Sequence, residues 1–240
     1  PVADTLLRVE AALALGLPAN ELTAHPSHTE FPGEVPANAT RVTRTVTIDG
    51  NQSGLPSNFG YASARAHLRM TTGLYAAAGE VVTVTLPNEA VQSGAYVLVG
   101  AHSDKLWGKE QLHRHPEITR WWYVDDTSME VGNAFGGPIY IAIEAGSSLG
   151  DFQVTLSNAV PAPSYLLGGT DLTDWLDQIR HEPAPWAEIG SDQFILTVPS
   201  HEIRQLENPD ELMTWWSQAL SMEHELYGFL PWPRVERAVF

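Results

Sequence analysis

The sequence has 240 residues, 43% of them hydrophobic, which is enough for one large domain or two small ones with a real core. The formal net charge is −16, from 13 basic and 29 acidic residues, so nucleic acid and anionic membrane surfaces are unfavourable partners. There is no cysteine, which excludes disulfides, thiolate metal sites and cysteine nucleophiles. No apolar run approaches the roughly 20 residues of a membrane span.

The first segment predicts a helix followed by a linker. Residues 4–16 carry an apolar stripe at helical spacing, with Asp4 as a cap and Gly16 and Pro18 as a stop. The stretch that follows is rich in proline and predicts an extended crossing segment. We therefore assign residues 1–38 to an N-terminal helix and linker.

From about residue 40 the period of apolar residues changes to two, which is typical of β-strands. Short strands at regular spacing, without long helices between them, predict a β-sandwich over residues 39–168. The expected strands cover residues 41–49, 80–87, 95–101, 118–124, 138–144 and 151–160.

Residues 169–240 predict a mixed α/β segment. A helix is expected over 170–182, a strand over 193–198 and a longer helix over 209–227, which begins at the Asn208 cap and ends at Gly228. The closing letters "RVERAVF" resemble the start of another strand. The predicted fold class is therefore mainly β, a β-sandwich with appended helices at the N-terminus and in the C-terminal third.

The letters "HEIRQ" at residues 201–205 differ by one position from H-E-x-x-H, a zinc motif in which two histidines four residues apart on a helix bind one ion. Gln205 stands where the second histidine would be, and a neutral amide is a poor zinc ligand. We interpret the stretch as a short helical turn after a strand, with Ser200 as its N-cap.

The other polar clusters predict no catalytic residue and no metal ligand in this chain. His113 and His115 could share a face, with His102 and Asp104 as further candidates, but a polar loop is the simpler interpretation. We therefore expect the chain to bind zinc no more tightly than an ordinary surface histidine does.

Eight tryptophans are too many to be all exposed. Trp121 and Trp122 are adjacent, so on a strand one side chain faces the core and the other faces outward. An outward aromatic side chain on a β-sandwich is a platform on which a sugar can stack, or it packs under a loop.

Six blocks, in order, resemble the enhancin-like zinc metallopeptidases, a family of viral enhancing factors and bacterial mucinases. The blocks are "TGLYAAAGEVVTVTLP" (72–87), "VLVGAHSD" (97–104), "RHPEITRWW" (114–122), "NAFGGPIYI" (133–141), "PAPWAEI" (183–189) and "ILTVPS" (195–200).

The resemblance implies that this chain is the amino-terminal, β-rich region of a secreted peptidase that acts on mucin-type or other glycoproteins. The family's H-E-x-x-H motif is absent from the 240 residues, so the zinc of the intact enzyme is expected in a downstream catalytic portion of the same polypeptide, packed against this region. The implied compartment is extracellular or the bacterial cell surface.

The resemblance also implies substrate-facing residues. In "NAFGG" two glycines permit a tight turn or the close approach of a ligand. We expect Asn133, Phe135, Gly136, Gly137 and Trp186 to face the substrate cleft, although a β-turn entering the next strand would explain the glycines as well.

A second hypothesis remains open. The chain could be a non-catalytic carbohydrate-binding or adhesion module built on the β-sandwich. An H-E-x-x-H motif downstream of Phe240 in the gene would decide for the peptidase.

Overall fold

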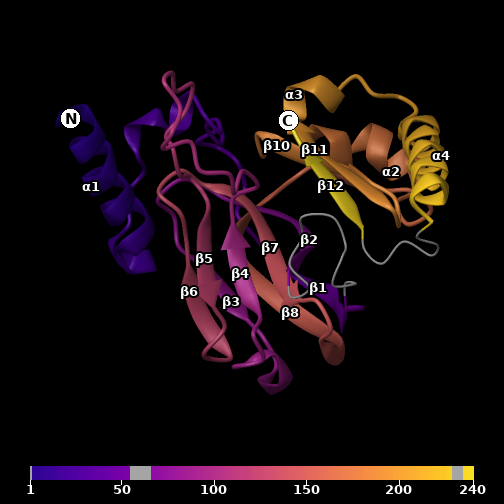
Figure 1. Ribbon diagram of the computed structural model, residues 1–240, viewed down its shortest axis with the longest axis horizontal. Helices are drawn as coiled ribbons and strands as arrows, with labels where there is room; N and C mark the ends of the chain where they lie inside the picture. The colour runs from indigo at the N-terminus through magenta and orange to yellow at the C-terminus, as the bar shows by residue number, and fades with distance from the viewer. Residues whose placement is uncertain (1, 55–65, 229–234) are drawn as a thin grey trace.

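The computed structural model describes residues 2–54, 66–228 and 235–240, and its architecture is mainly β (Figure 1). Two antiparallel layers form a β-sandwich, a separate four-stranded sheet packs against the outside of one layer, and helices lie at the flanks. The predicted fold class is confirmed.

The sandwich layers are joined at one corner. The first layer contains, in spatial order, β1 (Val42–Asn51), β8 (Ser148–Pro161), β3 (Val82–Thr85) and β6 (Ser128–Val131). The second layer contains β2 (His67–Ala76), β7 (Gly137–Glu144), β4 (Tyr96–Val99) and β5 (Arg120–Tyr123). The end of β8 pairs with β2, Val160 opposite Tyr75, so one long strand holds both layers together.

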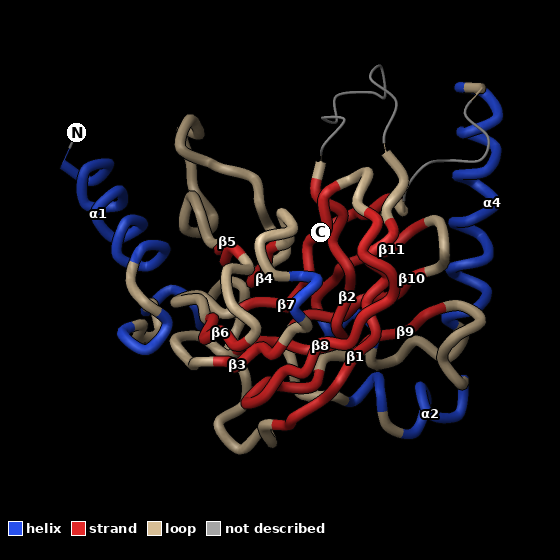
Figure 2. The backbone as a smooth tube through the Cα atoms, turned by 90° about the horizontal axis from the view of Figure 1, so that it is seen from below, coloured by secondary structure: helices blue, strands red, loops and turns tan. Residues whose placement is uncertain are grey.

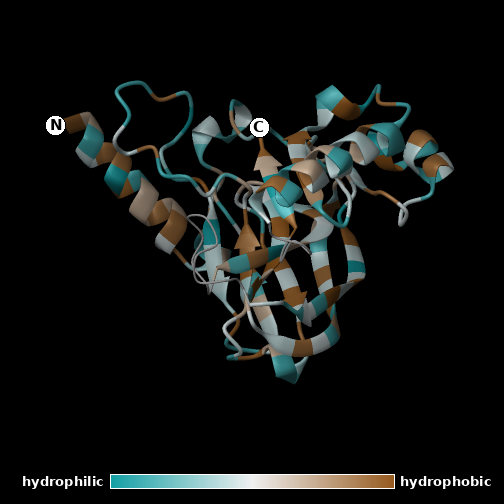
Figure 3. Cartoon of the chain, turned by 45° about the vertical axis from the view of Figure 1, so that its right-hand side comes forward, coloured by the Kyte–Doolittle hydropathy of each residue, from teal (hydrophilic) through white to brown (hydrophobic). Residues whose placement is uncertain are grey.

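The sandwich core follows from the alternation of side chains along each strand, visible as alternating bands in Figure 3. Val82, Val84 and Val154 are fully buried between the layers. Trp122 packs against this core, whereas Trp121 lies on the outer face and is 41% exposed. The expectation that the two tryptophans face opposite sides is thus confirmed.

The C-terminal sheet has a mixed order, with parallel pairs at both edges and an antiparallel pair at its centre. Its strands, in spatial order, are β12 (Glu236–Val239), β11 (Phe194–Pro199), β10 (Trp186–Gly190) and β9 (Ser164–Leu166). The helices α2 (Leu172–Asp177), α3 (Ser200–Ile203) and α4 (Pro209–Tyr227) belong to the same region. Trp175 and Met213 are fully buried in the core that these elements share.

The C-terminal sheet docks on the outer face of the second sandwich layer. Val239 of β12 packs against Leu98 and Tyr140, and this contact explains why β7 is buried on both faces. At the centre of the contact Arg237 forms an ion pair with Glu188, and both side chains are almost fully buried. A charged pair thus sits between two sheets that otherwise pack through apolar side chains.

Helix α1 (Val2–Gly16) stands at the opposite flank from α4 (Figure 2). It packs through Ala14 against Phe135 and its neighbours, while Leu6 and Val9 remain exposed. No helix in the described ranges is long and apolar enough to cross a membrane. Single 3-10 turns lie at η1 (Ala19–Glu21), η2 (Pro26–Thr29), η3 (Asn88–Ala90) and η4 (Ile179–His181).

Several local expectations were met and others were not. The helix predicted over 209–227 is α4, and "RVERAVF" contains β12, whereas the helix predicted over 170–182 is split into α2 and η4. Strands β2, β6, β9 and β10 were not predicted.

The predicted N-cap at Ser200 is wrong. The Ser200 hydroxyl donates to the carbonyl of Ala184, and the residue is already part of helix α3. The predicted boundary near 168 stays a prediction, although β9 pairs with the C-terminal sheet.

The start of α4 permits a simple test of local stability. The Asn208 side chain accepts a hydrogen bond from the Glu211 amide at 3.2 Å. Asn208→Ala leaves that amide without its partner and should lower the free energy of unfolding by about 0.5–2 kcal/mol, whereas Asn208→Asp should retain most of it. Urea unfolding of the three proteins measures the difference, and equal midpoints would show that the cap contributes nothing.

Candidate functional site: a pocket between the sandwich and the C-terminal sheet

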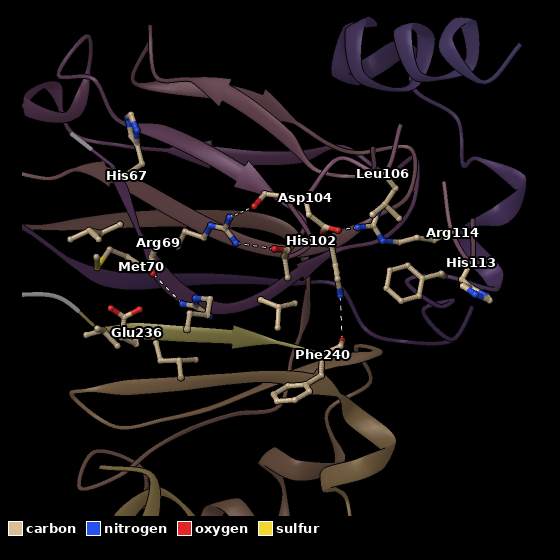
Figure 4. A pocket seen from close by; sticks show the side chains of 18 of the residues that line it. His67, Arg69, Met70, His102, Asp104, Leu106, His113, Arg114, Glu236 and Phe240 are labelled. Carbon is tan, nitrogen blue, oxygen red and sulfur yellow. Dashed lines mark hydrogen bonds and ion pairs between the residues drawn. The ribbon is translucent and has the colours of Figure 1, made fainter. Parts of the chain in front are cut away.

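A pocket of about 890 Å³ opens where the C-terminal sheet meets the sandwich (Figure 4). Strand β2 lines one wall, the segment from Ala101 to Arg114 lines another, and β12 with Phe240 closes the third. We call it the inter-sheet pocket. Its side chains come from segments far apart in the sequence, because β12 docks beside β2.

Arg69 of β2 is the most informative side chain in this pocket. Its guanidinium donates to the carbonyl of Ala101 at 2.8 Å and to the hydroxyl of Ser103. Both partners are neutral, so the positive charge is oriented but not neutralised by them. Burial lowers the pKa of Arg69, with Tyr140 acting in the opposite direction, and an arginine remains charged under such a shift. The site thus presents a positive charge in a chain that is strongly acidic overall.

Arg114 and His102 form the neighbouring wall. Arg114 donates to Asp104 at 2.6 Å and to the carbonyl of His115, which fixes the loop over the pocket. The imidazole Nε2 of His102 lies 3.4 Å from the Phe240 carbonyl. This contact links the sandwich loop to the end of β12. The pocket wall is therefore held in place from both sheets.

The "NAFGG" residues lie inside the fold. The Asn133 amide donates to the carbonyls of Val99 and Ile118 at 2.9 and 2.7 Å, and the Phe135 ring is fully buried. Gly137 has a φ of 148°, and a Cβ atom there would lie 2.5 Å from the Cα atom of Gly100. Gly136, with a φ of 72°, is similarly crowded by backbone.

These positions give the "NAFGG" loop a packing role, and its role in substrate contact stays a prediction.

Trp186 lies closer to the pocket. Its indole donates to the Pro32 carbonyl at 2.7 Å, and its ring meets Phe31 and His102, which both line the pocket. Trp186 therefore supports the wall from behind.

The sequence analysis missed Arg69 and Arg237. Strand β2, which carries Arg69, was not predicted, and the letters "RVERAVF" gave no sign that Arg237 would pair with Glu188.

The "HEIRQ" histidine lies elsewhere. His201 and Glu202 are exposed on α3, with 3.1 Å between Nε2 and Oε1. Within the described ranges, the histidines that line the pocket do not come together as three metal ligands. Its polar groups are the side chains described above, Arg69, His102, Asp104 and Arg114 among them.

The half-buried His102 predicts a pH dependence of stability. Burial lowers its pKa, which the Phe240 carbonyl only partly offsets. As the pH falls below the ordinary value of 6.5, the unfolded chain takes up the proton before the folded one does, so stability is lost on acidification. The melting temperature should fall between pH 7.5 and 5.5, and His102→Gln should reduce that fall. An unchanged slope in the variant would assign the effect to other groups.

The fold defines a class: a β-sandwich with a mixed α/β sheet docked on its outer face. The chain matches the family model for the N-terminal domain of M60-like peptidases over residues 37–157, half of its length. It also matches peptidase M60, enhancin and enhancin-like, over residues 158–239. The chain therefore belongs to the M60-like peptidase family, as the resemblance predicted, and the inter-sheet pocket lies between the two matched regions.

The curated relatives are longer proteins. TRPM8 channel-associated factor 2 of Bos taurus is 37% identical over 71% of this chain and 19% of its own length. The TRPM8 channel-associated factor homolog of Xenopus laevis is 38% identical over 81% of this chain and 20% of its own length. The chain thus spans about a fifth of the length of these relatives.

Solved structures share the fold. A functionally unknown conserved protein from Bacillus anthracis has a TM-score of 0.64 at 15% identity, over 82% of this chain and 41% of that one. The M60 catalytic domain of ZmpC from Clostridium perfringens, solved in complex with the sialyl T antigen, has a TM-score of 0.57 at 11% identity, over 82% of this chain and 44% of that one. At these identities the likeness shows the fold alone.

Proposed function

We propose that this chain is the substrate-side, amino-terminal region of a secreted, zinc-dependent metallopeptidase that acts on mucin-type or other glycoproteins. Its two family matches support the peptidase class. A structural neighbour with the same fold was solved with the sialyl T antigen, which supports a glycan as the ligand. Secretion and the mucin-type substrate belong to the same proposal and come from the family resemblance.

The observation that carries the proposal is the oriented charge of Arg69 in the inter-sheet pocket. A guanidinium held by neutral acceptors retains its full charge for an anionic ligand, and its fork geometry suits a carboxylate. Sialic acid is a sugar that carries such a carboxylate. The pocket therefore fits a sialylated glycan better than a neutral one.

The chain's own chemistry in this proposal is binding and orientation. Arg69 would bind the glycan's carboxylate, and the wall fixed by Arg114 and Asp104 would limit how the sugar enters. The intact enzyme would use zinc to polarise a water molecule and the scissile carbonyl. Because the 240 residues contain no H-E-x-x-H motif, no zinc-bound step is assigned to them.

The rest of the polypeptide is the expected partner of α4. Trp215 is 58% exposed on this helix, and Met222 and Leu226 are exposed on it too. Apolar side chains of this size on a helix surface mark an interface. We propose that the downstream catalytic portion covers them.

The proposal is tested by calorimetric titration of the chain with a sialylated O-glycopeptide and its desialylated form. The sialylated peptide should bind more tightly. Arg69→Gln should weaken it roughly tenfold or more, since a hydrogen bond to a charged group is worth about 1.5–3 kcal/mol. Arg8→Gln, on exposed α1, is the control and should bind as the wild type does. Equal binding of the two glycopeptides would contradict the proposal.

A specific surface favours the second function, a non-catalytic glycan-binding module. Tyr96, Trp121 and Tyr123 form an edge-to-face row with His67 on the outer face of β4 and β5. Exposed aromatic faces of this kind bind sugars by stacking. The relatives with 35–38% identity are named for association with a channel, which supports a binding role. Neutral glycan binding that is lost in Trp121→Ala, but retained in Arg69→Gln, would favour this function.

A further inference from the structure

A second polar cluster lies away from the inter-sheet pocket, where α1 meets the sandwich. Glu10 projects from α1, His25 stands immediately before the turn η2, and His115 belongs to the segment that leads into β5. One ligand atom from each residue lies within 4.8 Å of the other two. None of the three lines the inter-sheet pocket.

The imidazole of His115 has an unusual environment. The residue is only 6% exposed, and its Nε2 atom has no hydrogen-bond partner. A buried polar atom without a partner costs free energy, so such an atom calls for an explanation. The position of this Nε2 atom, within reach of His25 and Glu10, supplies an explanation. A metal ion between the three residues would accept the lone pair of Nε2.

Both histidines can present Nε2 to the same point. The Nδ1 atom of His115 lies 2.9 Å from the Glu117 carbonyl, and the Nδ1 atom of His25 lies 2.8 Å from the Ser27 hydroxyl. The backbone amides of Ser27 and Glu117 also point at these Nδ1 atoms, at 3.2 and 3.3 Å. A bound metal ion would select the tautomer in which each Nδ1 instead donates its proton to the nearby oxygen and each Nε2 keeps a free lone pair. Metal-bound histidines are oriented by hydrogen bonds of this kind from their second nitrogen.

The two imidazoles lie against an aromatic ring. The Phe135 ring packs against both imidazoles, with ring centres 4.6 and 4.9 Å away. The ring closes the inner side of the cluster. An ion would therefore reach the cluster from the side of Glu10, whose side chain is half exposed.

The three ligand atoms, which lie within 4.8 Å of one another, would have to move closer together to hold an ion. The Nε2 atom of His25 and the Oε2 atom of Glu10 are 3.9 Å apart. Two ligand atoms bound tetrahedrally to zinc lie roughly 3.3–3.6 Å from each other, given bond lengths of about 2.0–2.2 Å. Glu10 is a flexible, exposed side chain that can close this difference.

We propose that Glu10, His25 and His115 bind one divalent transition-metal ion, with zinc as the best match to two imidazoles and a carboxylate. Water completes the fourth position. Because Glu10 is on α1 and His115 is on the sandwich, the ion fastens the N-terminal helix to the body of the protein. The sequence analysis assigned no metal ligand here, since the three residues are far apart in the chain.

The test is calorimetry with zinc chloride on the metal-free chain, followed by cobalt substitution and visible absorption. We expect one ion per chain, a cobalt spectrum typical of tetrahedral coordination, and a zinc-dependent rise in melting temperature. Glu10→Gln and His25→Gln should each weaken zinc binding about tenfold or more and remove the rise in melting temperature. Glu10 is exposed, so its variant keeps the test valid even if His115→Gln fails to fold.

His201→Gln is the matched control, because His201 also lies beside a glutamate but on the exposed surface of α3. It should bind zinc as the wild type does. Two results would overturn the proposal: less than one zinc ion per chain in the wild type, or unchanged affinity in both Glu10→Gln and His25→Gln.

Discussion

Arg237→Met is expected to lower the free energy of unfolding by about 3–5 kcal/mol, because it leaves the buried carboxylate of Glu188 without its counter-charge. Arg237 also donates to the Arg69 carbonyl and the Thr71 hydroxyl, both at 3.1 Å, so the same side chain joins β12 to β2. Loss of these bonds should loosen the docking of the C-terminal sheet on the sandwich.

Chemical unfolding followed by tryptophan fluorescence measures this effect. The double variant Glu188→Gln, Arg237→Met removes the uncompensated charge and should regain part of the lost stability. Arg8→Met is the surface control, since the Arg8–Asp4 pair is more than half exposed and should contribute about 0–1 kcal/mol. If Arg237→Met and Arg8→Met cost the same, the buried pair does not hold the two sheets together.

Phe135→Ala is expected to cost about 3–5 kcal/mol, the range for removing a large aromatic side chain from a core. The ring is fully buried against Ala14 and Ile118, so its loss opens a cavity beneath α1. Phe135→Leu keeps most of the volume and should cost less, and Tyr227→Ala, at an exposed position on α4, should change stability by less than about 0.5 kcal/mol.

The Phe135 variants also separate the packing role from the role predicted from the sequence. If Phe135→Ala unfolds as readily as the wild type but no longer binds the glycopeptide, Phe135 contacts the substrate. If stability falls and the folded fraction still binds the glycopeptide, the "NAFGG" loop supports the fold.

The sequence was sufficient for elements with a clean period. β8 alternates between buried and more exposed side chains over residues 151–157, and α4 is capped by Asn208 and Gly228 as predicted, because local side-chain chemistry fixes both ends. β2 was missed because the strand is irregular: its pairing with β7 shifts register between Thr71 and Tyr75, and Gly73 has a φ of 67°. β10 is buried on both faces, so it shows no alternation.

The site was harder to predict than the fold. Arg69, Arg114 and Arg237 come from three separate segments, and only the docking of β12 beside β2 brings them to one pocket. The same limit applies to Glu10, His25 and His115, which share no motif. Motif reasoning finds ligands that are close in sequence, whereas both sites here depend on tertiary contacts.

We propose that the inter-sheet pocket selects a glycoprotein substrate for an M60-type peptidase. The most direct measurement is cleavage of a sialylated mucin-type glycoprotein by the natural gene product that carries this sequence, with and without a chelator, for wild type and Arg69→Gln. We expect chelator-sensitive cleavage, with kcat/KM roughly tenfold lower in Arg69→Gln on the sialylated substrate and unchanged on the desialylated one. Absence of cleavage, or an equal loss on both substrates, would contradict this role of the pocket.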